Sequence, residues 1–419
     1  MSIIEKNKIN ISQILEYFLA FLLMLSCNSV YSTAVNADFL INECLIVVTI
    51  FLCFVNGKIT IGSSVKKTLP ILLLVLSLYF VIKISKISIQ AYILNFFVFF
   101  PCMVIYISAA KDKFSIYKKF SSVVFIISTL STIVWFLSEI VPVLSPTFSV
   151  VISWGATKHV SGILGLFFRC QRDSTFGFDF FRNTGLFAEA PMHSLVLSIA
   201  LIYELFLTPK VKKKRVIPLI IYIFTTVSAT GILCIMLCAF LCIWKSVNNK
   251  KKSVRVIYIL FVVFFLPVMF MVIDGILETK SATNSYTIRM IDYIAGFNAW
   301  KDNPIFGVGY GNNAELYSYK FKFYVDAGFN TNIIGFSNSI MSLLGQGGIV
   351  LFTLYLLPFL TFVFRNKSDN LRCWSISLIM LLITTIFHTR FIMIYLLALS
   401  YILFSTSKRE VLECEVNPK

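Results

Sequence analysis

Two polar segments of this otherwise apolar chain carry residues that could catalyse a reaction. In the first, Arg182 is followed by Glu189 and, four positions later, by His193. That spacing places Glu189 and His193 on one helix face, and a carboxylate next to an imidazole can accept a proton as a general base. The alternative is a structural Glu–Arg or Glu–His pair that holds the loops together.

The second segment combines an arginine with aromatic residues and a glycine-rich turn. Arg289 is followed by Trp300 and by the sequence Gly-Val-Gly-Tyr-Gly from Gly307 to Gly311. A guanidinium group presents a rigid fork of donors that suits phosphate oxygens, and glycine lets the backbone approach a diphosphate or a sugar closely. A plain turn above the bilayer is the alternative. The strand and helix of a dinucleotide-binding fingerprint do not flank this turn, which excludes that function.

The elements that must position these residues are membrane helices. Of the 419 residues, 58% are hydrophobic and only 14% are charged, a composition typical of polytopic membrane proteins. Apolar runs of about 17 to 25 residues recur, each long enough to cross a bilayer core of ~30 Å as a helix. Lipid offers no partners for free backbone groups, so the runs must be helical. We predict an all-α protein with one integral membrane domain over residues 1–419 and about twelve transmembrane helices, near 11–27, 38–56, 68–84, 90–110, 120–142, 184–207, 213–228, 230–245, 256–275, 336–364, 371–387 and 390–406.

The basic residues behind the net charge of +17 are distributed as the predicted topology requires. Twelve spans place both termini on one side, and that side receives most of the 37 basic residues, among them the run from Lys210 to Arg215. Under the positive-inside rule this face is cytoplasmic, so the charge requires no nucleic-acid partner. Residues 216–245 are apolar with basic clusters at both ends. We therefore predict a tight turn at residues 228–231 that divides them into two short spans.

Two long loops, residues 143–183 and 276–335, are predicted on the opposite, outer face. Long loops in compact folds are often functional, and the many aromatic residues of the second loop argue against disorder. The first loop is semi-apolar between Val143 and Phe168, where we predict a re-entrant or interfacial helical segment.

Ionisable residues outside the two main segments have different expected roles. Arg172 lies in the first outer loop, and His388 and Arg390 occupy a short turn that faces the same compartment, so all three are further candidates for a site. Glu204 lies near the basic inner face and is expected to form an ion pair. A packing role is the default for Glu16.

Motifs for metals and cofactors are missing from the sequence. Cys234, Cys238 and Cys242 share one helix face, but no histidine or acidic residue neighbours them, so ordinary packing is the favoured interpretation. No phosphate-binding P-loop is present. We predict no bound metal ion and no cofactor.

Three short motifs together resemble a known family. They are the segment from Arg182 to Pro191, the segment from Arg289 through Trp300 to Asn303–Gly311, and the segment Phe336–Ser339 continued by Gly347-Gly348-Ile349. Their order and their placement on the outer loops resemble the O-antigen ligase and Wzy-type O-antigen polymerase superfamily. The resemblance covers about residues 120 to 365.

The resemblance implies a glycosyltransferase with a C-type fold in the bacterial inner membrane. Its active site would face the periplasm and would act on undecaprenyl-diphosphate-linked sugars without a metal ion or a nucleotide sugar. Ligases typically carry histidine before the asparagine of the third motif, and here that position is Ser337. This difference favours a polymerase of O-antigen, capsule or exopolysaccharide. The alternatives are a ligase that transfers glycan to lipid A core, and a flippase or transporter of lipid-linked sugars.

The same reasoning assigns expected roles to individual residues. Glu189 is the expected base, and Arg289 and Arg182 are expected to stabilise the charge of the leaving diphosphate. The expected partners are an undecaprenyl-diphosphate-linked oligosaccharide and membrane lipid, with a chain-length regulator protein as a further candidate. The residues expected to bind substrate are Arg172, His193, Trp300, Gly307, Gly309, Tyr310, Asn338 and Arg390.

Overall fold

Helices form most of the chain. The computed structural model describes residues 11–34, 38–55, 63–154, 156–174, 179–248, 284–327, 335–365 and 368–405. The helices in this part, two of them of the π type (η), are α1 (Ile11–Leu25), α2 (Val30–Thr33), α3 (Asp38–Val55), α4 (Ser63–Lys83), α5 (Ile89–Tyr92), η2 (Ile93–Phe99), α6 (Phe100–Ala109), α7 (Ser115–Trp135), η3 (Phe136–Ile140), α8 (Ala190–Phe206), α9 (Lys213–Thr225), α10 (Ala229–Asn248), α12 (Asn284–Asp302), α13 (Asn313–Asp326), α14 (Ser339–Arg365), α15 (Asp369–Thr384) and α16 (Phe391–Ser405).

Each predicted span in the described part of the chain overlaps a helix. The predicted ninth span, residues 256–275, lies outside the described residues. The apolar run 216–245 is divided as predicted, because α9 ends at Thr225 and α10 begins at Ala229. The predicted position of the turn was wrong, since the break lies at residues 226–228 and residues 229–231 belong to α10. The predicted span 184–207 was wrong at its start, since α8 begins only at Ala190. Pro191 suits the first turn of a helix, where its missing N–H group has no intrahelical acceptor.

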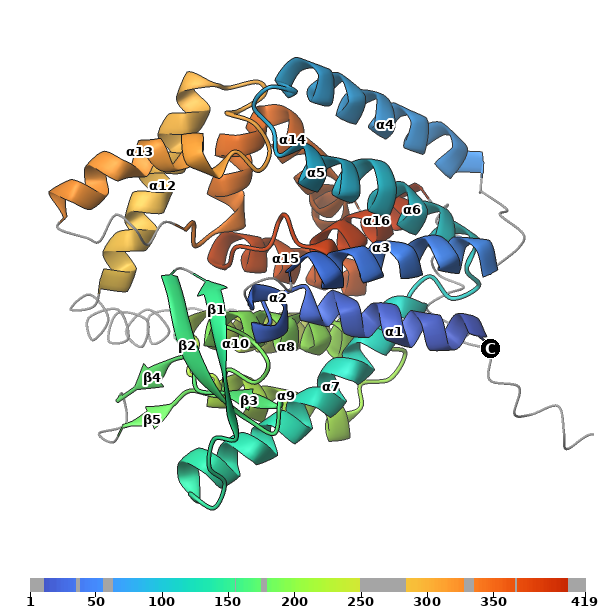
Figure 1. Ribbon diagram of the computed structural model, residues 1–419. Coiled ribbons are helices and arrows are strands. Elements are labelled where there is room, and N and C mark those ends of the chain that lie inside the picture. Colours follow the sequence, from blue (N-terminus) through green and yellow to red (C-terminus); the bar gives the residue numbers. More distant parts are fainter. Residues whose placement is uncertain are drawn as a thin grey trace, which may run out of the picture.

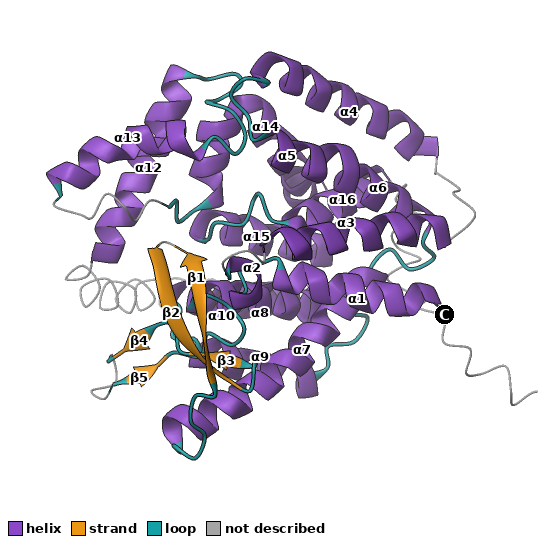
Figure 2. Cartoon of the chain, in the orientation of Figure 1, coloured by secondary structure: helices purple, strands orange, loops and turns teal. Residues whose placement is uncertain are grey.

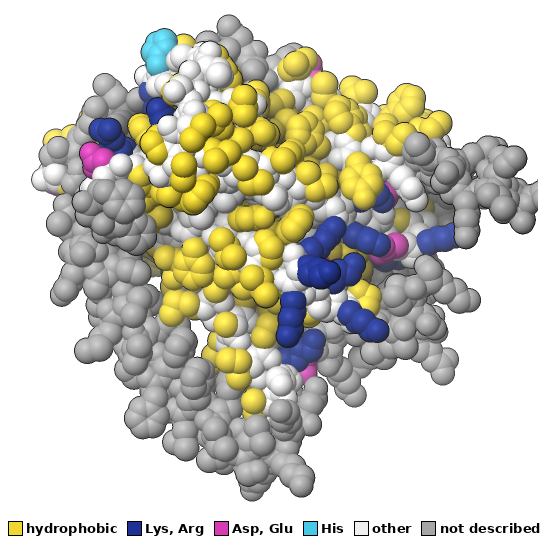
Figure 3. Space-filling model, turned by 90° about the horizontal axis from the view of Figure 1, so that it is seen from below, with side chains coloured by type: hydrophobic (Ala, Val, Ile, Leu, Met, Phe, Trp, Pro, Cys, Tyr) yellow, Lys and Arg dark blue, Asp and Glu magenta, His cyan; other side chains and the backbone are white. Residues whose placement is uncertain are grey.

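The fold is that of a multi-pass membrane protein. Within the described residues, five helices are long and apolar enough to cross a bilayer, and four shorter apolar helices accompany them. Side chains such as Phe54 and Phe364 remain more than three-quarters exposed, as expected for surfaces that face lipid. Figure 3 shows Lys and Arg side chains gathered on one face next to a broad hydrophobic area. The exposed Lys212, Lys213 and Lys214 at the start of α9 belong to the face predicted to be cytoplasmic.

The first outer loop corrects the prediction of an all-α fold, because it forms β-structure and not a re-entrant helix (Figure 2). The strands are β1 (Phe148–Trp154), β2 (Ala156–Ile163), β3 (Phe167–Phe168), β4 (Arg172–Asp173) and β5 (Phe180–Phe181). Strands β1, β2 and β3 form an antiparallel sheet, and β4 pairs with β5. Ile152 of β1 and Val160 of β2 are buried, while Ser153 and His159 are exposed. Branched residues in that two-residue alternation favour a strand.

The second outer loop also has secondary structure in its described part. Helices α12 and α13 occupy it, and the Asn312 side chain caps α13 by accepting a hydrogen bond from the Glu315 amide at 3.2 Å. Figure 1 shows α12, α13 and the strands gathered at one end of the helical bundle, at the left of the view. The two segments singled out for chemistry therefore lie at the same end of the molecule.

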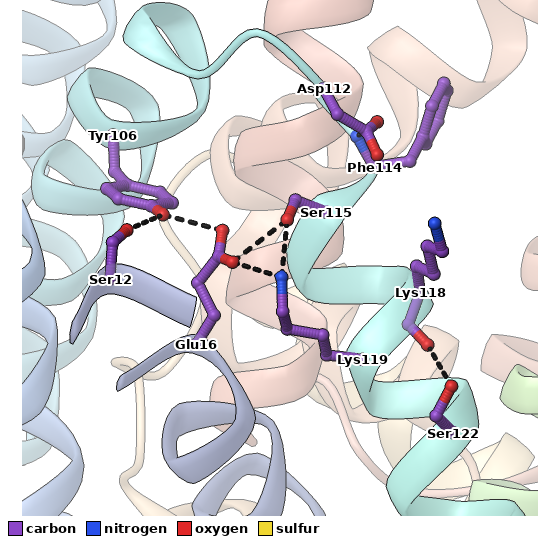
Figure 4. Close-up of polar contacts among 9 residues, drawn as sticks. All are labelled: Ser12, Glu16, Tyr106, Asp112, Phe114, Ser115, Lys118, Lys119 and Ser122. Carbon is purple, nitrogen blue, oxygen red and sulfur yellow. Dashed lines mark hydrogen bonds and ion pairs between the residues drawn. The ribbon is translucent and has the colours of Figure 1, made fainter. Parts of the chain in front are cut away.

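Polar side chains buried near the opposite end are paired with one another. The Glu16 carboxylate of α1 accepts hydrogen bonds from the Tyr106 hydroxyl at 2.6 Å and the Ser115 hydroxyl at 3.0 Å, and it forms an ion pair with Lys119 (Figure 4). This cluster joins α1 to α6 and α7, a more specific role than the packing expected of Glu16. The predicted ion pair of Glu204 is confirmed, since Arg215 lies 2.9 Å away.

Candidate functional site

Arg182 is anchored to the turn between α9 and α10. Its Nε donates to the Thr226 carbonyl at 2.9 Å and its Nη2 donates to the Val227 carbonyl at 2.8 Å. Val227 has a positive φ of 49°, and the guanidinium group binds the carbonyls of this strained turn. Burial lowers the pKa of Arg182, and the negative charges of Asp173 and Glu189 oppose that shift. Arg182 and Glu189 are therefore close enough to interact electrostatically.

Glu189 precedes α8 and is not part of the helix. It is the N-cap residue, with extended backbone angles (φ −146°, ψ 145°) and a half-buried side chain. The neighbouring amide of Ala188 donates to the Asn28 carbonyl at 3.0 Å, and the amide of Ala190 donates to the Gln171 side chain at 2.9 Å. These bonds fix the backbone on both sides of Glu189.

His193 is not placed with Glu189 on a helix face as expected, because Glu189 lies outside α8. Its Nδ1 donates to the Asn183 carbonyl at 3.0 Å, and its Nε2 lies 3.1 Å from the Ser128 hydroxyl. The ring stacks on Phe187 with a centroid distance of 5.4 Å. Both ring nitrogens thus serve to join α7, α8 and the segment before α8.

Arg289 lies on the side of α12 that packs against the ends of other helices. Residues 289, 292 and 293 share one helix face by their spacing. The Asp292 carboxylate accepts a hydrogen bond from the Ser337 amide at 2.7 Å, and the Tyr293 hydroxyl donates to the Ile383 carbonyl at 3.3 Å. Arg289 is half-buried and forms no ion pair among the described residues.

The segments that carry these arginines meet around the end of α15. The Thr230 hydroxyl donates to the Thr384 carbonyl at 3.4 Å, and the Ser339 hydroxyl donates to the Thr385 carbonyl at 2.7 Å. The turn from Thr385 to Arg390 continues from this point. We call the segments 182–189, 226–230, 337–339 and 384–390 the outer junction. The outer junction contains Arg182, Glu189 and Arg390. The face of α12 that carries Arg289 contacts the same region through Asp292 and Tyr293.

The glycine-rich turn packs against the protein itself. The amides of Val308 and Gly309 donate to the carbonyls of Gly345 and Gln346, each at 2.9 Å. A Cβ atom on Gly309, whose φ is 118°, would lie 2.5 Å from the Lys86 carbonyl oxygen. A Cβ atom on Gly307 would overlap the backbone of Gln346. The turn therefore joins the break in α14 to the connection between α4 and α5, as the alternative of a structural turn implies.

Tyr310 is buried inside this connection. Its hydroxyl accepts a hydrogen bond from Asn95 Nδ2 at 2.8 Å, and burial raises its pKa to about 12. Its ring lies edge-on to that of His388 at a centroid distance of 6.5 Å. Tyr310 consequently links the glycine-rich turn to the outer junction.

The other residues expected to bind substrate are placed differently from one another. Arg172 is exposed on β4 and lies 4.0 Å from Asp179. Trp300, near the end of α12, contacts Phe297, and its buried Nε1 has no hydrogen-bond partner among the described residues. Asn338 caps α14 by accepting a hydrogen bond from the Met341 amide at 2.8 Å. Of these three, only Asn338 belongs to the outer junction.

Sequence reasoning missed a buried ion pair beside the third motif. Lys320 of α13 pairs with Asp292 of α12, and its ammonium group lies 4.7 Å from the centre of the Phe336 ring. Burial raises the pKa of Asp292 and lowers that of Lys320. Since Asp292 also binds the Ser337 amide, this pair positions residues 336–338. The charges stand 28 residues apart in the chain, so no local pattern pointed to the pair.

Two comparisons bear on identity. The fold and the outer junction define a multi-pass membrane protein with basic and acidic groups gathered at one end of the helices. A family model described as O-antigen ligase matches residues 216–356, which include most of α9, Arg289, the glycine-rich turn and the first part of α14. This match supports the predicted resemblance to the O-antigen ligase and polymerase superfamily, a family of glycosyltransferase-type enzymes. No curated protein matches the chain.

Proposed function

We propose that the protein is a polysaccharide polymerase of the bacterial inner membrane. It joins undecaprenyl-diphosphate-linked repeat units at the periplasmic face and releases undecaprenyl diphosphate. The family match over residues 216–356 is the observation that carries this proposal. Ser337, which occupies the position where ligases typically carry histidine, favours polymerisation over ligation.

The reaction forms one glycosidic bond and breaks one bond to a phosphate oxygen. A hydroxyl group of the incoming lipid-linked unit attacks the anomeric carbon of the growing chain. Its proton passes to the Glu189 carboxylate, and the bonding electrons leave with the diphosphate. Placing both lipid-anchored substrates in one site lowers the entropic part of the barrier.

Cationic side chains stabilise the charge that develops on the leaving diphosphate. Arg182 already uses Nε and Nη2 on backbone carbonyls, so it contributes from a fixed position. Arg289 has no ion-pair partner among the described residues and is the principal ligand of the diphosphate in this proposal. Arg390, in the turn before α16, is a further cation at the same junction.

The experiment compares arginine variants in cells that lack the chromosomal gene. Arg289→Ala should reduce glycan elongation by about 100-fold or more, the usual loss when a preorganised charge donor is removed. Arg289→Lys should restore only part of the activity, because lysine lacks the planar fork. Lys301→Ala changes an exposed cation on the same helix and serves as the matched control. Normal glycan ladders from Arg289→Ala would contradict the proposed role.

Ligation is the second candidate, because the matching family model is itself described as O-antigen ligase. The phenotype of a deletion separates the two reactions. Loss of a polymerase leaves single repeat units attached to lipid A core, whereas loss of a ligase leaves the core without any repeat unit. The accumulation of bare core would therefore replace polymerisation with ligation as the function.

A further inference from the structure

A buried histidine in the outer junction has two unused hydrogen-bonding atoms. His388 lies in the turn between α15 and α16, and only 1% of its surface is exposed. Neither Nδ1 nor Nε2 has a hydrogen-bond partner among the described residues. Burial without a partner destabilises a polar group, so this placement suggests a partner from outside the chain.

The position of His388 is fixed by other elements. Its amide donates to the Ser339 hydroxyl at 3.2 Å, and the amide of Phe387 donates to the same oxygen at 2.8 Å. The His388 carbonyl accepts a hydrogen bond from the Tyr355 hydroxyl at 2.9 Å. The start and the middle of α14 thus hold the turn in place, while no described residue forms a hydrogen bond with the imidazole itself.

The adjacent segment carries further unused polar atoms. Asn338 directly precedes Ser339, and its Nδ2 is buried without a partner among the described residues, although its Oδ1 caps α14. The Ser337 hydroxyl is likewise unpartnered in the described part of the chain. Two chain segments that contact each other through Ser339 therefore both present spare hydrogen-bonding capacity.

The chemistry of these atoms favours a ligand with hydroxyl groups. Burial and the nearby charge of Arg390 lower the pKa of His388 to about 3, so the imidazole is neutral and offers one donor and one acceptor. The Asn338 amide adds donors, and the Ser337 hydroxyl can act in either way. Diphosphate oxygens only accept hydrogen bonds, whereas each sugar hydroxyl both donates and accepts.

We propose that His388 and Asn338 form a subsite that binds hydroxyl groups of the lipid-linked sugar beside the reacting bond. This subsite deepens the proposed function and rests on it. Thr389 and Arg390, which follow His388 in the same turn, are half-buried. The bound sugar then supplies the partners that the imidazole and the amide lack.

The test uses two substitutions of His388 in the full-length protein. His388→Phe keeps a planar ring of similar size and removes both nitrogens, while His388→Gln keeps a donor and an acceptor. The substrate is the undecaprenyl-diphosphate-linked repeat unit isolated from cells that lack the gene. We expect His388→Phe to lower kcat/KM by about ten-fold or more, the effect of losing one or two hydrogen bonds to bound substrate. His388→Gln should retain part of the activity.

Thermal stability in detergent separates binding from packing. Because the His388 side chain forms no hydrogen bond with the described part of the chain, His388→Phe should keep or raise the melting temperature. His193→Phe is the matched control: it removes two existing hydrogen bonds and should lower the melting temperature. The subsite is wrong if His388→Phe elongates glycan at the normal rate. It is also wrong if the melting temperature of His388→Phe is as low as that of His193→Phe.

The outcomes also distinguish this inference from the proposed function. If Arg289→Ala abolishes elongation and His388→Phe leaves it unchanged, the subsite is wrong and the polymerase stands. If deletion of the whole gene leaves glycan length unchanged, the proposed polymerase function is wrong, and the proposed subsite, which rests on it, is wrong as well.

Discussion

Two groups of buried polar side chains, one near each end of the helical bundle, differ in their hydrogen bonding. Toward the end predicted to be cytoplasmic, Glu16 is bound by Tyr106, Ser115 and Lys119 (Figure 4). In the outer junction, His388 and Asn338 carry buried atoms without partners in the described chain. The paired cluster joins α1 to α6 and α7, whereas the unpartnered atoms are the ones that the proposed subsite would use to bind sugar.

The two buried histidines show the same contrast with a single residue type. His193 has a partner on each ring nitrogen, whereas His388 has none among the described residues. Both were candidates from the sequence, and only His193 was counted among the residues expected to bind substrate. The contacts favour the reverse assignment.

Disrupting the polar cluster around Glu16 should have the largest effect on stability. Glu16→Ala leaves the Lys119 ammonium group buried without its ion-pair partner, which should reduce stability by about 3 to 5 kcal/mol. Thermal unfolding in detergent measures the loss. The double variant Glu16→Leu with Lys119→Met should be more stable than Glu16→Ala, because no unpaired charge remains. If Glu16→Ala is as stable as the native protein, the cluster around Glu16 does not stabilise the fold, and the contrast with the outer junction is wrong.

The glycine-rich turn lies toward the outer end but is fully bonded, so it should behave as a structural element. Gly309→Ala places a side chain against the Lys86 carbonyl at a φ of 118°, and strain and overlap should together destabilise the fold by about 2 to 4 kcal/mol. Gly335→Ala is the control, since no atom lies within 4 Å of its added Cβ. A Gly309→Ala protein with native stability and lost activity would instead indicate that the turn binds substrate.

Acidification should weaken the fold through His388. Its pKa is about 3 in the folded protein against 6.5 for an unperturbed histidine. Between these values the unfolded chain binds the extra proton, so stability falls as pH drops from about 6.5 toward 3, by at most about 1.4 kcal/mol per pH unit. Melting temperatures measured across this range should fall less steeply for His388→Phe. Parallel curves for the two proteins would show that His388 is not held neutral.

An exposed ion pair should matter least. Lys86 and Glu315 lie 3.1 Å apart, but their side chains remain 48% and 32% exposed. Such pairs contribute about 1 kcal/mol or less. Lys86→Ala should therefore shift the melting temperature only slightly, and high salt should abolish the difference. A loss as large as that of Glu16→Ala would show that partial exposure is a poor guide to the strength of these pairs.

The sequence predicted the helices well because hydropathy is a local property. Continuous apolar runs must be helical in lipid, and basic clusters on both sides of residues 216–245 led to the division that the turn at Val227 confirms. The ion pair of Glu204 followed from its position near the basic residues. The orientation of the helices across the membrane stays a prediction.

The β-sheet of the first outer loop was missed for an equally local reason. Its apolar character was read as a sign of membrane insertion, although Val150, Val151 and Ile152 are branched residues that favour strands. Once β1 pairs with β2, one side of each strand is buried and the other is exposed.

The sequence by itself determined the membrane class, most helix boundaries and the motifs that resemble the superfamily, because these depend on neighbouring residues. Only the tertiary structure decided which polar groups are already bonded. The glycine-rich turn forms hydrogen bonds with Gly345 and Gln346, and Asp292 forms an ion pair with Lys320. His193 forms hydrogen bonds with Ser128 and Asn183. Hydrogen bonds between distant segments leave no trace in the local sequence. The sequence could therefore name His388 and Asn338 as candidates, but only the folded chain shows that their buried polar atoms have no partner among the described residues.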